Sequence, residues 1–226
     1  MVDSGFVYSG FRDTVVCYVC GADVGEWSHG ASPHVEHLRE NPLCAINVLW
    51  KRNMDTRQLT NALSSNAHTS PLFRGVYPAD KLPKSFNYPA SFVVNTDPST
   101  KGGTHWIAVY MDENGRGDYF DSYGITPFIR EHINFMNRVC ASWKWNKVKL
   151  QGWGSTVCGN YAAVFIFHRS KGHSMKKFLS SFDNSNSVNN DSKFMKIYDE
   201  IFTCCSIWEH NNSSCFQTCR GSRAAV

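Results

Sequence analysis

Residues 150–163 read LQGWGSTVCGNYAA, a glycine-rich loop that runs into an apolar helix with Cys158 at the junction. The unpaired N–H groups and positive dipole end of a helix N-terminus favour a thiolate. A thiolate held there attacks carbonyls, and the N–H of Cys158 is aimed at the oxyanion that forms. Gln151, seven residues earlier, offers a second donor. The segment predicts a cysteine nucleophile; the alternative is a small buried cysteine that begins a core helix.

A thiolate nucleophile needs a base, and the chain offers nine histidines. His105, in the run GGTHW (102–106), stands where a loop enters a predicted strand, a place where rigid sheets present catalytic groups. At a rise of about 1.5 Å per residue, His168 lies about 15 Å from Cys158 on the same helix, which is too far. The others belong to the N-terminal segment (His29, His34 and His37) or to polar stretches expected to be exposed (His68, His132, His173 and His210).

A carboxylate on a neighbouring strand would orient the ring of His105, and Asp121 in the run YFDSYG (119–124) is the candidate. The run ENGRG (113–117) predicts the hairpin turn between the two strands. Simple pairing about this turn places Asp121 opposite residue 108, three residues from His105. The pair therefore requires a stagger or a bent strand.

The pattern after residue 51 predicts a mixed α+β domain with an antiparallel-rich sheet flanked by helices. The polar stretch 180–192 (SSFDNSNSVNNDS) is typical of an exposed loop. Strands are expected at 91–94, 106–111, 119–123 and 147–150, and helices over 33–40, from a capping box at 55–58, and over 126–138, 158–169, 174–182 and 193–202.

The N-terminal segment carries a second chemical signal, a set of zinc-type ligands. Cys17 and Cys20 form a C-x2-C pair, followed by His37 and Cys44. Three thiolates and one imidazole make the closed tetrahedral shell of a structural zinc. A segment of about fifty residues buries little surface, so a metal is a natural means of holding it together. The alternative is three buried thiols and an unrelated histidine.

The composition sets limits on the class of protein. Of the 226 residues, 42% are hydrophobic and 19% charged, which allows a core and argues against disorder. No apolar run approaches the roughly eighteen residues of a membrane span, and the first ten residues do not resemble a secretory signal. A net charge of +4 is too small to argue nucleic-acid binding. Nine cysteines, an odd number, favour metal ligands or a reactive thiol over disulfides.

The N-terminal run resembles the zinc-binding core of BIR domains, the modules of inhibitor-of-apoptosis proteins. The resemblance implies a structural zinc on the four ligands above, in a module that lacks the helices preceding this core in BIR domains. Ala31 and Glu40 stand where BIR peptide grooves have an acidic residue and an aromatic wall, and Trp27 is expected in the core. The matching features are GF-x-Y-S-G at 5–10, Asp13 before Cys17 and Cys20, Trp27, Pro33, Glu36-His37 and Pro42-x-Cys44.

The order His105-Trp106, Asp121, Gln151 and Cys158-Gly159 resembles that of adenovirus-type (adenain-like) cysteine endopeptidases and, more distantly, of SUMO- and ubiquitin-like-specific proteases. The resemblance spans about residues 54–205. It implies Cys158 as nucleophile, His105 as base, Asp121 as orienting carboxylate and Gln151 as oxyanion donor. Asp121 replaces the glutamate of adenovirus enzymes and matches the SUMO-protease branch.

The same resemblance implies that Trp106 and Gly103 line a narrow cleft that favours glycine beside the cut; for Trp106 a place in the core is the alternative. Cys140 occupies the position, eleven residues before Gln151, where an activating peptide forms a disulfide with adenovirus enzymes, but a buried free thiol is expected here. The tail residues Cys204, Cys205, His210, Cys215 and Cys219 match no standard zinc spacing.

These inferences predict a BIR-like zinc module (1–50), a papain-like or adenain-like protease domain (51–210) and a cysteine-containing tail (211–226). The expected function is a cysteine endopeptidase that processes viral or transposon structural precursors in the nucleus, cytoplasm or virion. A ubiquitin-like-protein isopeptidase and a non-catalytic BIR-type interaction protein are the alternatives. Zinc is the expected cofactor and a protein or peptide the expected substrate; the resemblance also raises an activating peptide or DNA cofactor. No membrane partner is expected.

Overall fold

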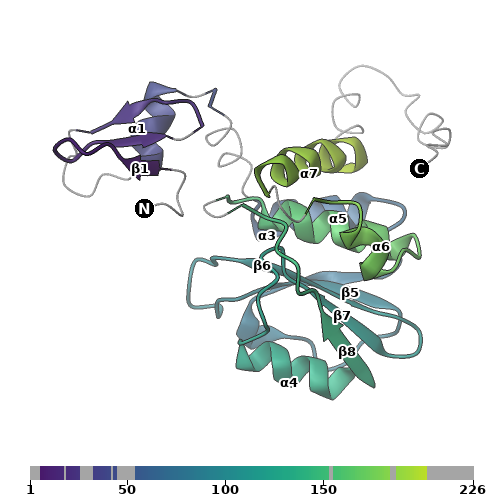
Figure 1. Cartoon of the computed structure of the whole chain (residues 1–226). Helices are drawn as coiled ribbons and strands as arrows, with labels where there is room; N and C mark the ends of the chain where they lie inside the picture. Colours follow the sequence, from purple (N-terminus) through teal and green to yellow (C-terminus); the bar gives the residue numbers. More distant parts are fainter. Residues whose placement is uncertain are drawn as a thin grey trace.

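The computed structural model describes residues 6–17, 19–25, 33–41, 43–44, 54–152, 155–183 and 187–202. These residues form a small three-stranded sheet with one helix, and a five-stranded sheet with helices on both faces (Figure 1). The predicted α+β class is confirmed. None of the described helices has the length and apolar character that crossing a membrane requires.

The N-terminal unit is an antiparallel sheet of β1 (Phe6–Tyr8), β2 (Val15–Cys17) and β3 (Asp23–Val24), followed by α1 (Pro33–Glu40). The predicted helix over 33–40 is confirmed. Among the described residues of this unit, the buried hydrophobic cluster includes two of the predicted zinc ligands: its members are Phe6, Val15, Cys17, Val24 and Cys44. A third predicted ligand, His37, is also fully buried.

The larger sheet is antiparallel at its centre and parallel at both edges. β5 pairs antiparallel with β6 and β6 with β7, whereas the β4–β5 and β7–β8 pairs are parallel. In spatial order the strands are β4 (Phe73–Tyr77), β5 (Ala90–Asn95), β6 (Trp106–Met111), β7 (Arg116–Phe120) and β8 (Ser142–Trp145).

The strands predicted at 91–94 and 106–111 are confirmed, but the predicted position of the edge strand is wrong. The pattern predicts it over 147–150, whereas the chain pairs through β8, and the pattern does not predict β4. The half-buried Trp143 and Trp145 alternate with exposed neighbours in β8. Leu150 instead donates its N–H to the carbonyl of Ser122 at 2.9 Å, outside any strand.

Two apolar layers lie on the two faces of the large sheet (Figure 1). α3 (Thr56–Ser65), α5 (Cys158–Ser170), α6 (Met175–Leu179) and α7 (Ser187–Phe202) cover one face. α4 (Arg130–Val139) covers the other, and a short 3-10 helix, η2 (Ala79–Lys81), lies after β4. α5 is buried from its first residue through Ile166, so it forms the centre of its layer.

The helix predictions hold best where a local signal marks the start. The capping box of Asp55 and Gln58 is present at α3, and α5 begins at Cys158 as predicted. α4 begins at Arg130, four residues after the predicted start, because the chain is still extended at residue 129. α7 begins at residue 187, so the exposed loop predicted over 180–192 is wrong in its second half.

Candidate active site

Cys158 is the first residue of α5 and is only 5% exposed. No side chain caps this helix N-terminus, so its amides remain directed at the space beside the sulfur. The next residue must be small: a Cβ on Gly159 would lie 2.9 Å from Cβ of Met54 and 3.3 Å from Cδ1 of Trp106. The thiol is therefore held at the end of a tightly packed helix.

His105 lies one residue before β6 and contacts both of its predicted partners. Its Nε2 is 2.8 Å from Oδ1 of Asp121, and Cys158 is near enough to raise the pKa of the ring. Since Nε2 is engaged by the carboxylate, Nδ1 is the nitrogen available to the thiol. The structure thus brings together three residues from the start of β6, the end of β7 and the start of α5.

The register of the hairpin explains how His105 and Asp121 meet. Ala108 pairs with Phe120, so Asp121 falls opposite residue 107 and not opposite 108 as simple pairing predicts. The shift arises because the turn closes earlier, with the N–H of Asp112 bonded to the carbonyl of Arg116 at 3.1 Å. Both side chains then lie just beyond the paired segments and bridge the end of the hairpin.

The electrostatics of His105 favour its protonated form. Burial lowers the pKa of the imidazole, but the hydrogen bonds to Asp121 and Cys158 outweigh burial and raise the pKa to about 9. An imidazolium is therefore the main species at neutral pH. This cation is a proton donor placed beside the side chain of Cys158.

The position of Asp121 depends on two residues that the sequence interpretation does not single out. Asn146, 1% exposed, accepts the N–H of Asp121 at 2.7 Å and donates to its carbonyl at 2.6 Å. Tyr123 donates its N–H to the Asp121 carboxylate at 2.9 Å, and its ring lies 5.0 Å from that of His105. Tyr123 belongs to the YFDSYG run, so its place beside the candidate Asp121 was a usable signal.

Gln151 is fully buried at the same site, but its amide bonds to the loop. Its Nε2 donates to the carbonyl of Ser155 at 2.6 Å and to the hydroxyl of Tyr123 at 3.2 Å. Its Oε1 accepts the hydroxyl of Ser122 at 2.6 Å. The hydrogen bond with Tyr123 connects the amide of Gln151 to the candidate catalytic residues. The role of this amide as oxyanion donor stays a prediction.

Trp106 and Gly103, the predicted substrate contacts, both pack against other residues of the protein. The half-buried Trp106 donates its indole N–H to the carbonyl of Met54 at 2.8 Å and packs against Gly159, so it forms a wall beside Cys158. Gly103 is exposed and has φ of +82°, and a Cβ there would lie 2.8 Å from Nδ2 of Asn95. Contact of either residue with substrate stays a prediction.

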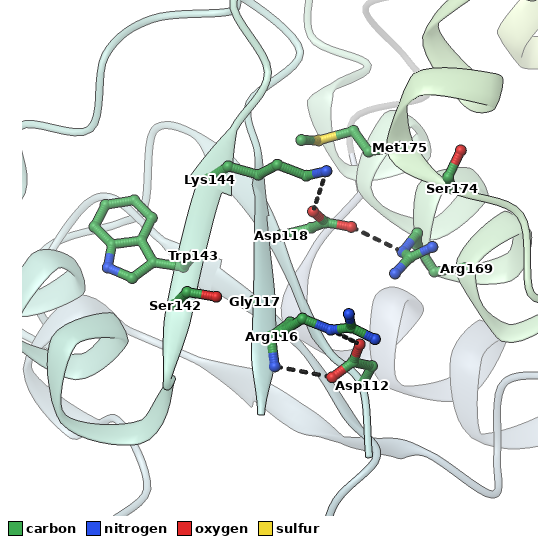
Figure 2. Close-up of a pocket in the computed structure, with 10 residues that line it drawn as sticks. All are labelled: Asp112, Arg116, Gly117, Asp118, Ser142, Trp143, Lys144, Arg169, Ser174 and Met175. Atoms are coloured by element: carbon green, nitrogen blue, oxygen red, sulfur yellow. Dashed lines mark hydrogen bonds and ion pairs between the residues drawn. The ribbon is translucent and has the colours of Figure 1, made fainter. Parts of the chain in front are cut away.

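A hollow of about 310 Å³ lies elsewhere on the large unit, between β7, β8 and the C-terminal end of α5 (Figure 2). Its charges pair with one another: Asp118 lies 3.0 Å from Arg169 and 3.9 Å from Lys144, and Arg116 lies 2.8 Å from Asp112. Cys158 and His105 do not line it. The hollow is therefore separate from the candidate active site.

The four predicted zinc ligands converge in the N-terminal unit. The ligand atoms of Cys17, Cys20, His37 and Cys44 all lie within 4.8 Å of one another. Sγ of Cys17 is 3.8 Å from Sγ of Cys44, and Sγ of Cys20 is 3.2 Å from Nε2 of His37. Two thiolates at about 2.3 Å from a tetrahedral zinc lie about 3.8 Å apart, so the geometry and the donor set fit zinc.

The charge of this cluster also suits a cation. Burial raises the pKa of Cys20, but hydrogen bonds with His37, Cys44 and Cys17 lower it to about 6. A thiol that ionises this readily is a ready metal ligand. The four residues thus have the geometry of a structural zinc site, and Cys20 ionises readily enough to bind the metal.

The remaining sequence predictions have mixed outcomes. Cys140 is a free thiol as expected, half-buried, and burial raises its pKa to about 11. His132 is not exposed: it is 1% exposed, and its ring bonds Tyr119 and the carbonyl of Asn95. The predictions for Trp27, Ala31, Cys204, Cys205, His210, Cys215 and Cys219 concern residues outside the described ranges.

Comparison with known proteins finds matches for the N-terminal unit. Residues 1–47 match the family model of the BIR, or Inhibitor of Apoptosis, domain. Baculoviral IAP repeat-containing protein 1g of Mus musculus is 46% identical over 67 residues, which is 30% of this chain and 5% of that protein. Baculoviral IAP repeat-containing protein 7-B of Xenopus laevis is 31% identical over 81 residues, 36% of this chain and 24% of that protein. The chain spans a quarter or less of the length of these relatives.

Solved structures resemble the chain more remotely. A crystal structure of an ASFV protease aligns with 64% of this chain and 67% of its own, at 20% identity and a TM-score of 0.45. The central domain of an uncharacterised Legionella pneumophila protein covers 66% of this chain and 96% of its own, at 14% identity and a TM-score of 0.39. Both TM-scores lie below 0.5, so the function of the larger unit has to be argued from its own residues. The N-terminal 47 residues, by contrast, match the BIR domain family and carry its zinc-type ligand set.

Proposed function

We propose that the chain is a cysteine endopeptidase in which Cys158 is the nucleophile, His105 the general acid and base, and Asp121 the carboxylate that orients the imidazole. The observation that carries the proposal is the 2.8 Å hydrogen bond between the partly buried imidazole of His105 and Asp121, with Cys158 near enough to raise the pKa of the same ring. The thiol stands at a helix N-terminus with no capping side chain, which adds a positive field at the sulfur. These are the parts that nucleophilic catalysis by a thiol requires.

The proposed reaction runs in two halves. The thiolate of Cys158 forms a C–S bond to the substrate carbonyl carbon, and the N–H at the start of α5 holds the oxyanion. The imidazolium of His105 then gives its proton to the leaving amine as the C–N bond breaks. A water molecule, deprotonated by the neutral imidazole, attacks the thioester, and the acid product leaves as the thiolate–imidazolium pair is restored.

Gln151 is the proposed second oxyanion donor. Its amide nitrogen bonds Ser155 and Tyr123 in the structure, so a turn of the side chain is needed before it donates to substrate. Catalytic hydrogen bonds often align only when substrate is bound, so this geometry is compatible with the role.

We propose glycine beside the scissile bond, as the resemblance to adenovirus-type enzymes implies for a cleft lined by Trp106 and Gly103. The resemblance to adenovirus-type enzymes supports a structural precursor of a virus or transposon as the substrate, met in the nucleus, cytoplasm or virion. The proposed zinc is structural: it holds the N-terminal unit together and takes no part in the chemistry.

Profiling with glycine-containing peptides tests the function. The wild type should cleave a subset of peptides and react with a glycine-aldehyde or vinyl-sulfone probe at Cys158, and Cys158→Ala should do neither. Cleavage that survives Cys158→Ala would contradict the assignment of the nucleophile. If the wild type cleaves only after the Gly-Gly tail of a ubiquitin-like protein, the chain is an isopeptidase. If the wild type neither cleaves peptides nor reacts with the probe, the alternative of a non-catalytic interaction protein is supported.

A further inference from the structure

The polar stretch before α7 contains a buried carboxylate that the proposed mechanism does not use. Asn190 and Asp191 are each 2% exposed, although their run of sequence is rich in serine and asparagine. Burying a carboxylate is costly unless several donors satisfy it. The donors around Asp191 therefore indicate what this residue does.

The donors to Asp191 come from the loop and the helix that hold Cys158. The carboxylate accepts the N–H of Gly152 at 3.1 Å and the hydroxyl of Tyr161 at 2.8 Å. Ser155 is near enough to lower the pKa of the same carboxylate. Gly152 precedes Cys158 in the loop, and Tyr161 lies in the first turn of α5. The carboxylate thus joins α7 to both sides of the candidate nucleophile.

The contacts of α7 bracket Gln151. On one side, Nδ2 of Asn190 donates to the carbonyl of Leu150 at 3.3 Å; on the other, Asp191 accepts the N–H of Gly152. The N–H of Gln151 itself donates to the carbonyl of Ser122 at 3.0 Å. Three hydrogen bonds therefore fix the backbone around Gln151, and the acceptor of one of them is the charged carboxylate of Asp191.

We propose that Asp191 is a positioning residue of the active site, which holds Gly152 and thereby places the amide of Gln151 and the loop that ends at Cys158. The inference rests on the proposed function. Asp191 does not bond Cys158 or His105 in the structure, so it acts through the loop and transfers no proton. Charge-assisted hydrogen bonds are about twice as strong as neutral ones, which suits a carboxylate to fixing a glycine backbone.

The electrostatics of Asp191 agree with this role. Burial raises its pKa to about 6, even though Tyr161, Ser155, Gly152 and the charge of Lys149 favour the ionised form. At neutral pH the group is thus still a carboxylate and accepts from both Gly152 and Tyr161. A carboxamide of the same size has a single acceptor oxygen and presents an NH2 group to the remaining donors.

The experiment compares three variants of the full chain. Asp191→Asn keeps the size and removes the charge. Glu200→Gln removes the same charge from an exposed position of the same helix and is the matched control. Tyr161→Phe deletes one donor and leaves the Gly152 contact intact. For each variant and the wild type, kcat and KM are measured on the peptide that the wild type cleaves fastest. The rate of iodoacetamide alkylation at Cys158 is measured by mass spectrometry, and hydrogen exchange at the amide of Gly152 is measured by NMR.

The expected result separates positioning from a general loss of structure. Alkylation by iodoacetamide builds no oxyanion, so it reports the thiolate alone. Asp191→Asn should lower kcat about tenfold or more while KM and the alkylation rate change less than about twofold, since losing one oxyanion donor elsewhere costs about a hundredfold or more. The Gly152 amide should exchange faster in Asp191→Asn than in Glu200→Gln, and Tyr161→Phe should stay close to the wild type.

Two results would overturn the inference. In the first, Asp191→Asn has the same kcat and the same Gly152 exchange rate as Glu200→Gln. In the second, kcat and the alkylation rate of Asp191→Asn fall together because the variant loses its folded state. A failure of the proposed function has a different signature. In that case the wild type itself turns over no peptide, while the exchange of Gly152 still reports whether Asp191 holds the loop.

Discussion

At the scale of single residues, the proposed chemistry depends on the proton of His105. The ring is partly buried, yet the hydrogen bond to Asp121 and the proximity of Cys158 raise its pKa and keep it protonated at neutral pH. Asp121 is in turn held by Asn146 through two backbone hydrogen bonds. A short chain of buried polar contacts thus connects the edge of the sheet to the sulfur.

A pH profile tests this residue. Because the folded pKa of His105 is about 9, above its usual value of 6.5, we expect kcat/KM to fall as the pH rises through about 9 and the general acid is lost. The same shift stabilises the fold fully below about pH 6.5, and that stabilisation is lost as the pH rises through about 9. Asp121→Asn should move the alkaline limb to lower pH, since it removes the partner that raises the pKa. An alkaline limb that stays in place in Asp121→Asn would show that the carboxylate does not set the proton affinity of His105.

At the scale of elements, the start of α5 is where packing and chemistry coincide. Met54, which precedes α3, and Trp106, at the start of β6, both press on Gly159, and their backbone and indole are hydrogen-bonded to each other at 2.8 Å. The helix start is therefore confined by two elements that are distant in sequence. This confinement holds Cys158 at a defined place relative to His105.

Substituting Gly159 tests this confinement. Gly159→Ala adds a Cβ 2.9 Å from that of Met54, and we expect it to lower the free energy of unfolding by about 1–3 kcal/mol and to reduce peptide turnover. Gly102→Ala is the matched control, because a Cβ there meets nothing within 4 Å, so it should change stability by less than about 0.5 kcal/mol. Denaturant unfolding and turnover measure both effects. Equal stabilities for the two variants would show that the helix start has room to move.

At the scale of the whole molecule, the chain combines two units with different sources of stability. The large unit has apolar layers on both faces of its sheet, whereas the apolar cluster among the described residues of the N-terminal unit has five members, two of them zinc-type ligands. We expect the N-terminal unit to draw stability from a metal. The match of residues 1–47 to the BIR family agrees with this organisation.

Elemental analysis tests the metal. The wild type should carry one equivalent of zinc, and Cys17→Ser should lose it, because a closed four-ligand site does not tolerate the loss of a thiolate. Cys140→Ser removes a thiol outside the cluster and should keep the zinc. The large unit should remain folded in both variants, as judged by its thermal transition. Zinc that persists in Cys17→Ser would place the metal elsewhere.

Features that depend on local sequence could be predicted. The C-x2-C pair, the capping box at Asp55 and the junction at Cys158 each specify their structure within a few residues, because caps, turns and metal ligands act over short distances. Position in sequence also sufficed to choose His105 and Asp121 as partners. The two domains expected at 1–50 and 51–210 remain predictions.

Tertiary structure alone decided where these residues meet. The register that brings Asp121 to His105 depends on a turn that closes at Asp112, one residue away from simple pairing. The burial of Asp191 depends on donors about 30 and 39 positions earlier in the chain, which no composition of its own segment reveals. The sequence by itself determined which groups are the candidates for the chemistry, because local motifs and their order single them out. Their distances and ionisation came only from packing, because both are set by neighbours far away along the chain.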